Sequence, residues 1–165
     1  MRTIPRHVIP SKARSFKVGV TAFEHGDYAT ALEYWRPFAE LGDTMTQTVL
    51  GGLYHLGRGV PQDDAKAAKW LHKAAEQGNA RGQTLLGLLF AMGRGVPKDD
   101  VLAYMWLHIA AASNITEARN GRDKVARGMT TVETMKAQRM ANKWMAKHQK
   151  RQLDTSKNLA NLTAF

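Results

Sequence analysis

The chain contains an internal repeat that restricts its fold more than any other feature. Residues 50–75, LGGLYHLGRGVPQDDAKAAKWLHKAA, return as residues 86–111, LGLLFAMGRGVPKDDVLAYMWLHIAA. The two copies align without a gap, 36 residues apart, and both carry the linker GRGVP and a matching tryptophan, Trp70 or Trp106. A fixed period of this length, with helical patterning on both sides of a Gly/Pro-rich linker, predicts helix pairs that stack into a solenoid. The expected fold class is therefore all-α, an α-solenoid of stacked antiparallel helix pairs.

A third, less similar unit precedes the two full copies. Apolar residues at helical spacing begin near Phe16, break at Gly26 and Asp27, and resume around Trp35, which stands where Trp70 and Trp106 do. We expect three helix-pair units at 16–42, 43–78 and 79–114. They would lie between a basic, disordered arm (1–15) and C-terminal capping helices (115–150), followed by a tail (151–165).

Glycines and acidic residues mark the helix boundaries inside each full copy. Gly57 and Gly93 stand where a first helix ends, and Asp63 and Asp99 stand where they would cap the second helix. A glycine-rich loop before a helix also suggests a phosphate cradle. The Lys-Ser/Thr signature of such a loop is missing, and acidic caps would repel phosphate, so we exclude this interpretation.

The first helices contain Gly51 and Gly87 in their interiors, where glycine costs about 1 kcal/mol relative to alanine. We expect a close helix approach to compensate for this cost, with small residues such as Ala74 and Ala110 on the facing second helices.

The periodic pattern stops at Arg119, and a different kind of helix is predicted to follow it. Thr130 and Glu133 form a capping box at its start, and an apolar stripe runs beside a strongly basic face. The stripe consists of Val132, Met140, Trp144 and Met145. A solenoid must cover its last open core face, so we expect residues 131–150 to close the array.

Charge is distributed unevenly along the chain. Residues 1–23 carry five cations and no anion, residues 24–118 eight cations and eleven anions, and residues 119–165 eleven cations and three anions. A basic balance confined to the two ends keeps open an alternative function, association with nucleic acid or an anionic surface. The candidate contacts are Arg2, Arg6, Lys12 and Arg14 together with Lys143, Lys147, Lys150 and Arg151.

The sequence contains no clear signal for membrane insertion, secretion, metal binding or catalysis. The chain has no cysteine, no apolar run near the ~20 residues that cross a bilayer, and no secretory signal. As written it predicts a cytoplasmic monomer, with a periplasmic or secreted location open if a leader was removed. His72 and His108 lie one repeat apart, too far to share a zinc ion bound at ~2 Å, and no nucleophile-base motif occurs. We expect no enzyme activity, no cofactor and no metal.

The full copies resemble the Sel-one-like repeat family, a relative of the tetratricopeptide repeat with a longer glycine-rich linker. Its pattern is matched in the first copy by Leu50-Gly51, Tyr54, Gly57, Gly59-Val60, Asp63, Ala67, Trp70, Ala74-Ala75 and Gly78. The second copy departs from it at Phe90 and Asn114, and unit 16–42 looks more like a tetratricopeptide. The resemblance implies a right-handed solenoid that acts as a scaffold or adaptor.

By the same resemblance, the first helices line a concave groove that binds a protein or peptide. The predicted partner-binding residues are Phe23, Thr48, His55, Leu56, Arg81, Thr84, Leu88 and Met92.

Overall fold

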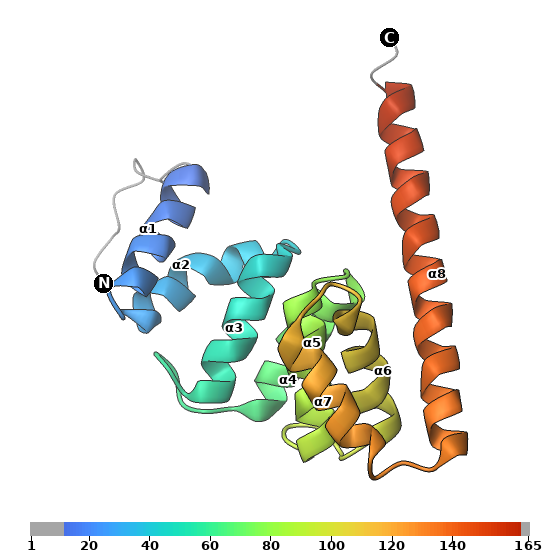
Figure 1. Ribbon diagram of the computed structural model, residues 1–165. Helices are drawn as coiled ribbons and strands as arrows, with labels where there is room; N and C mark the ends of the chain where they lie inside the picture. The colour runs from blue at the N-terminus through green and yellow to red at the C-terminus, as the bar shows by residue number, and fades with distance from the viewer. Residues whose placement is uncertain (1–11, 163–165) are drawn as a thin grey trace.

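The computed structural model describes residues 12–162, which form eight helices and, in that range, no strand (Figure 1). The helices are α1 (Lys12–Glu24), α2 (Tyr28–Glu40), α3 (Thr44–Leu56), α4 (Asp64–Glu76), α5 (Ala80–Met92), α6 (Asp100–Ala111), α7 (Thr116–Ala126) and α8 (Thr131–Leu162). Residues 1–11 of the predicted arm lie outside this range, and its last residues belong to α1.

Each helix from α1 to α6 packs against the next one along the chain. Pairs α1–α2, α3–α4 and α5–α6 correspond to the three predicted units, and first helices of successive units also touch, α3 with α5 and α5 with α7. Contacts that run from neighbour to neighbour are those of a solenoid. The predicted all-helical solenoid is therefore confirmed.

The turns between units follow a common scheme. Asp43 and Asn79 cap α3 and α5. Their side-chain oxygens accept hydrogen bonds from the backbone N–H groups of Thr46 and Gly82, three residues later, at 2.7 and 2.9 Å. The residue before the cap is left-handed, with φ of 100° at Gly42 and 89° at Gly78. In the third turn Asn114 adopts φ 60°, a conformation that asparagine tolerates better than most side chains. Asn114 thus keeps the left-handed conformation of the turn, but the cap of α7 is Ile115, which makes no side-chain hydrogen bond.

The first helices approach the second helices closely at the predicted glycines. A Cβ on Gly51 would lie 2.5 Å from Cγ of Leu71, and one on Gly87 would lie 2.7 Å from Cγ of Leu107. The close approach is therefore present, but the glycines receive leucines, whereas the sequence suggested Ala74 and Ala110. Each glycine hydrogen leaves room for a branched side chain that is 0–1% exposed.

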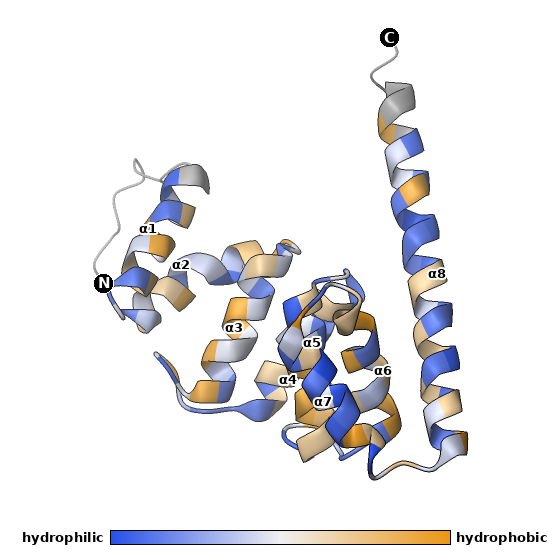
Figure 2. Cartoon of the chain, in the orientation of Figure 1, coloured by the Kyte–Doolittle hydropathy of each residue, from blue (hydrophilic) through white to orange (hydrophobic). Residues whose placement is uncertain are grey.

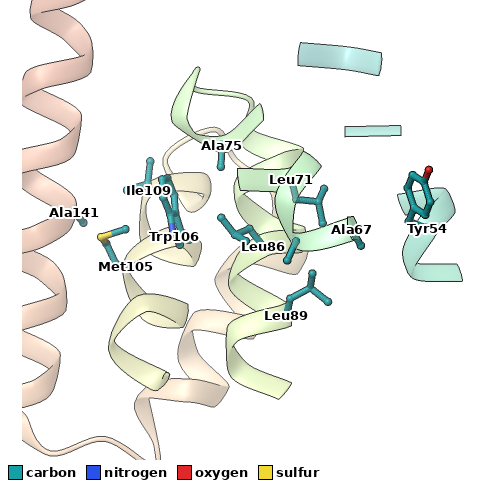
Figure 3. Close-up of a cluster of buried hydrophobic side chains, with 11 residues drawn as sticks. Tyr54, Ala67, Leu71, Ala75, Leu86, Leu89, Met105, Trp106, Ile109 and Ala141 are labelled. Atoms are coloured by element: carbon teal, nitrogen blue, oxygen red, sulfur yellow. The ribbon is translucent and has the colours of Figure 1, made fainter. Parts of the chain in front are cut away.

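The core is a chain of clusters and not a single centre. One cluster extends from Tyr54 on α3 through α4, α5 and α6 to Ala141 on α8 (Figure 3). Another joins α1, α2 and α3 around Trp35 and Leu50, and a third joins α6 and α7 around Leu107. Stability is thus supplied locally along the array.

The C-terminal segment continues the repeat for one more helix. Helices α3, α5 and α7 begin at Thr44, Ala80 and Thr116, each 36 residues after the one before. Helix α7 packs on α6 and α5 as the first helix of a fourth unit would. The four-residue connection Arg127 to Thr130 replaces the long linker of the full repeats, and α8 then leaves the pattern.

Helix α8 lies against α6 and not against α7 (Figure 1). Met140, Trp144 and Met145 pack partly buried against the main core cluster, but Val132 is 73% exposed, so its place in the predicted stripe was wrong. The buried line on α8 instead begins at Ala137 and Ala141, both 0% exposed. Where the sequence predicted a tail, α8 continues to Leu162, and Figure 1 shows this end standing clear of the other helices.

Candidate partner-binding groove

On α3 and α5, the first helices of the two full repeats, the most exposed large apolar side chains lie at the C-terminal ends. Leu56 at the end of α3 is 57% exposed, and Met92 at the end of α5 is 52% exposed. The two residues are 36 positions apart and therefore equivalent in the repeat. We call the part of α3 and α5 that carries His55, Leu56, Leu88 and Met92 the first-helix surface.

A pocket of about 340 Å³ opens at one end of this surface, between α5 and α7. Leu88, Met92 and Val125 contribute apolar walls, and Lys98 and Lys124 stand among the lining residues. Leu88 also belongs to the cluster under α7, so it is half-buried at the base of the pocket. The structure thus brings Leu88 and Met92 together, with α7 as a wall beside them.

His55 is held in place by a charge network that crosses two units. Its Nδ1 lies 2.6 Å from Oδ1 of Asp64, and Nε of Arg94 donates to Oδ2 of the same carboxylate at 2.8 Å. Burial acts to raise the pKa of Asp64, but the hydrogen bonds from His55 and Arg94 and their charges outweigh it, so this pKa lies below its ordinary value of 3.8. The carboxylate is therefore ionised at neutral pH and fixes the edge of the first-helix surface.

Two predicted groove residues do not reach the surface. Thr48 is 8% exposed and Thr84 is 0% exposed, and their Oγ1 atoms donate 2.8 Å hydrogen bonds to the carbonyls of Thr44 and Ala80. Their assignment to the groove was wrong, because each hydroxyl is satisfied by its own helix and each side chain packs between helices.

Phe23 and Arg81 lie at other places on the first helices. Phe23 is 37% exposed, and its ring packs 5.3 Å from that of Tyr28 and 5.5 Å from that of Trp35. Arg81, at the opposite end of α5 from Met92, pairs with Glu117 of α7 at 3.6 Å. Phe23 therefore contributes to the α1–α2 packing, and Arg81 links α5 to α7.

Helix α7 also contributes to this site, and its contribution was not predicted from the sequence. Gly121 of α7 allows close packing, since a Cβ there would lie 3.2 Å from Leu88 and 3.3 Å from Leu107. The available signal was the repeat period, because Thr116 lies 36 residues after Ala80. The departure of the residues from the repeat pattern after Arg119 concealed it.

Within residues 12–162, no group of three or more His, Asp and Glu side chains is placed to hold a metal ion. In the same range, none of the helices combines the length and the apolar character that a membrane span requires.

Comparison with known proteins identifies related sequences and folds. The Sel1 repeat pattern matches residues 16–43, 45–79 and 80–115. The first unit, which looked more like a tetratricopeptide from its sequence, therefore matches the same repeat as the other two. None of the curated proteins matches the chain.

Among the solved structures that resemble this chain are two repeat proteins. One is c5321, a protective antigen present in uropathogenic Escherichia coli strains and displaying an SLR fold, with 25% identity over 90% of this chain and a TM-score of 0.77. This chain spans only 33% of the length of that protein. The other is a Sel1 repeat protein from Oxalobacter formigenes, with 30% identity, a TM-score of 0.61, and coverage of 69% of this chain and 89% of that one.

Proposed function

The chain belongs to the Sel1 repeat family, whose members generally act as protein-interaction scaffolds, and we propose that its first-helix surface binds a protein or peptide partner. The observation that carries this proposal is the repetition of an exposed apolar residue, Leu56 and then Met92, at the same position of successive first helices. Isolated exposed apolar residues need no explanation, but a repeated position beside a pocket favours contact with a partner.

The partner we propose is an extended or helical segment with apolar anchors. One anchor would enter the pocket between α5 and α7, where Leu88 and Val125 offer apolar walls, and a second would contact Leu56. His55 is oriented by Asp64 and presents a polar group beside Leu56. Such a mixture of apolar anchors and a few fixed polar groups is typical of binding sites.

The experiment is a quantitative affinity capture with two matched variants. Leu56→Glu/Met92→Glu places two carboxylates on the first-helix surface, whereas Leu41→Glu/Leu153→Glu makes the same change at positions that are 73% and 55% exposed elsewhere. We expect the first variant to lose the captured proteins and the second to retain them, with both melting like the wild type. If both variants capture the same proteins as the wild type, the groove assignment is wrong.

A second candidate function is association with nucleic acid or another anionic surface through α8. It rests on a row of exposed cations at helical spacing, Lys136, Arg139, Lys143, Lys147 and Lys150, which we call the cationic row. Figure 2 shows hydrophilic residues along much of this helix. Arg151 is exposed beside the row, whereas the predicted N-terminal partners Arg2 and Arg6 lie outside the described residues.

A mobility-shift titration tests this second candidate. If six or more phosphate contacts form, affinity for a DNA duplex should fall by about 10³-fold between ~50 and ~200 mM salt. Lys143→Glu/Lys147→Glu should abolish the shift. The absence of any shift at low salt would exclude nucleic acid as the partner.

A further inference from the structure

A second pocket, separate from the first-helix surface, collects cations and aromatic rings around α4. It has a volume of about 290 Å³ and is lined by Arg36, Tyr54, Lys66, Lys69, Trp70 and Lys73. Arg36 comes from α2, Tyr54 from α3 and the other four residues from α4. No acidic side chain belongs to this lining. We call it the α4 pocket.

The aromatic rings hold several of these cations in place. Nζ of Lys73 lies 4.5 Å from the ring centroid of Trp70, and Nζ of Lys66 lies 5.6 Å from that of Tyr54. Arg36 donates a 3.2 Å hydrogen bond to the hydroxyl of Tyr54. Contacts of this kind reduce the freedom of long side chains without cancelling their charge.

Most of the positive charge in the α4 pocket is not neutralised within the described part of the chain. Lys66 forms an ion pair with Asp63 at 2.9 Å. Between residues 12 and 162, no carboxylate forms an ion pair with Arg36, Lys69 or Lys73, and all three are exposed. Arg36, Lys69 and Lys73 are therefore solvent-exposed cations beside the rings of Tyr54 and Trp70.

The next repeat has apolar residues at the equivalent positions, and a helix covers them. The residues 36 positions after Lys66, Lys69 and Lys73 are Leu102, Met105 and Ile109. Met105 is 6% and Ile109 is 5% exposed, and both lie in one cluster with Ala141 of α8 (Figure 3). Trp106, the equivalent of Trp70, packs its ring 5.7 Å from that of Trp144 of α8.

We propose that the α4 pocket is a docking site for an acidic helical segment of a partner protein. Helix α8 on α6 demonstrates that this face of a repeat accepts a helix, and the cations on α4 change the required complement from apolar to acidic. Carboxylates of the bound helix would pair with Lys69 and Lys73, and its aliphatic groups would pack over Trp70.

The charges of this chain argue against a second copy as the occupant. Its longest helix, α8, presents the cationic row on its exposed side and would be repelled by Lys69 and Lys73. The α4 pocket shares no lining residue with the first-helix surface. The two proposals can therefore fail independently, and both sites on one molecule would let it bridge two partners.

The experiment uses the full-length protein and a labelled helical peptide as the probe. The peptide has about 20 residues, enough for ~30 Å of helix, with glutamates at successive i, i+3 and i, i+4 positions, and its control replaces every glutamate by glutamine. Binding is followed by fluorescence anisotropy at low and high salt. A DNA duplex of matched charge is titrated as a competitor.

Three variants locate the binding site. Lys69→Glu/Lys73→Glu reverses the charge, and Lys69→Met/Lys73→Ile inserts the residues found one repeat later. Lys17→Glu/Lys157→Glu makes the same change of net charge at two other exposed positions. All three should melt like the wild type, because every altered side chain is exposed.

We expect the acidic peptide to bind, the glutamine peptide to bind at least about tenfold more weakly, and both Lys69/Lys73 variants to lose about tenfold or more in affinity. The Lys17/Lys157 variant should bind like the wild type. Equal loss in that variant would mean that only net charge matters, and unchanged binding in the Lys69/Lys73 variants would place the peptide elsewhere. Either result overturns the proposal, as does displacement of the peptide from this pocket by a tighter-binding DNA duplex.

Discussion

Two adjacent glycines of α3 have opposite surroundings. A Cβ on Gly51 would lie 2.5 Å from Leu71, whereas one on Gly52 would meet nothing within 4 Å. We expect Gly51→Ala to destabilise the protein by about 1–3 kcal/mol through overpacking. Gly52→Ala should stabilise it by about 0.5–1 kcal/mol, because alanine restricts the unfolded chain and favours the helix. Urea denaturation of the two variants measures both effects, and equal effects would contradict the close approach of α3 to α4.

His108 predicts a pH dependence of stability. Burial, and secondarily the charge of Arg122, lower its pKa below the ordinary value of 6.5. Its Nδ1 atom is buried without a hydrogen-bond partner in the described part of the chain, and its ring stacks on Tyr104 with 5.7 Å between centroids. The unfolded chain therefore binds a proton more readily than the folded one. Stability from this group is complete above pH ~6.5 and is lost as the pH falls through the folded pKa.

The substitution His108→Phe should remove that contribution. Its melting temperature should fall less than that of the wild type when the pH is lowered from about 7 to about 5. His72→Phe is the positional control, because His72 occupies the same place one repeat earlier but is exposed. Parallel curves for the wild type and His108→Phe would mean that this histidine does not titrate differently on folding.

Sequence patterning placed the caps and glycines correctly but not every surface residue. Asp63 and Asp99 both accept the predicted backbone hydrogen bond at a helix start. Thr48 and Thr84 were assigned to the groove from the resemblance to repeats whose first helices line a concave surface. Their hydroxyls bond to the carbonyl four residues earlier, an option that spacing alone does not reveal.

At the scale of elements, we expect the part of α8 that packs against α6 to be necessary for the stability of the fold. Truncation after Gly128 would expose Met105, Trp106 and Ile109, which are now 2–6% exposed. This truncation should lower the melting temperature and cause self-association, because it uncovers a contiguous apolar face. Calorimetry and light scattering measure the two effects. A stable, monomeric product would contradict the assignment of α8 as a cap.

A longer truncated chain provides the matched control. Stopping after Arg151 removes the part of α8 whose described side chains are all exposed and retains Ala137, Ala141, Trp144 and His148. The melting temperature should then change by less than ~2 °C, because little apolar surface is uncovered. A large drop would mean that the projecting end stabilises the array.

Trp144→Ala separates one contact from the whole helix. Its ring stacks on His148 at 4.7 Å and meets Trp106 edge-on, but the side chain is only partly buried. We expect a cost of about 2 kcal/mol, below the ~3–5 kcal/mol typical of a fully buried tryptophan. Thermal denaturation measures this cost, and a loss above that range would mean that the ring is covered more completely.

The elements differ in how far the sequence determines them. Helices α3 to α6 follow from the 36-residue repeat, α1 and α2 from helical spacing around Trp35, and α7 was available from the spacing of α3 and α5. The docking of α8 was not, because its sequence carries apolar residues on more than one side. Val132 and Met135 are 73% and 52% exposed although they look as apolar as Met140. Only the tertiary position of α6 decides which side is buried.

For the whole molecule, the separate core clusters predict that stability is regional. Trp35 in the first unit is 4% exposed, donates a 3.3 Å hydrogen bond to the carbonyl of Phe16, and holds α1 against α2. Trp106 occupies the equivalent place in the third unit, is 2% exposed, and belongs to the cluster that reaches α8. In an array whose units contact only their neighbours, removing one of these tryptophan side chains should destabilise mainly the helices around it.

Hydrogen exchange on Trp35→Ala and Trp106→Ala tests this regional stability. Both substitutions should cost about 3–5 kcal/mol in their own region. Trp35→Ala should remove amide protection from α1 and α2 while α5 to α8 remain protected, since none of the described residues of α5 to α8 belongs to the cluster around Trp35. Trp106→Ala should produce the converse pattern, with protection lost from α4 to α8. If either substitution lowers protection evenly across all eight helices, the array unfolds as one cooperative unit, and a partner bound at either end would then stabilise the whole of it.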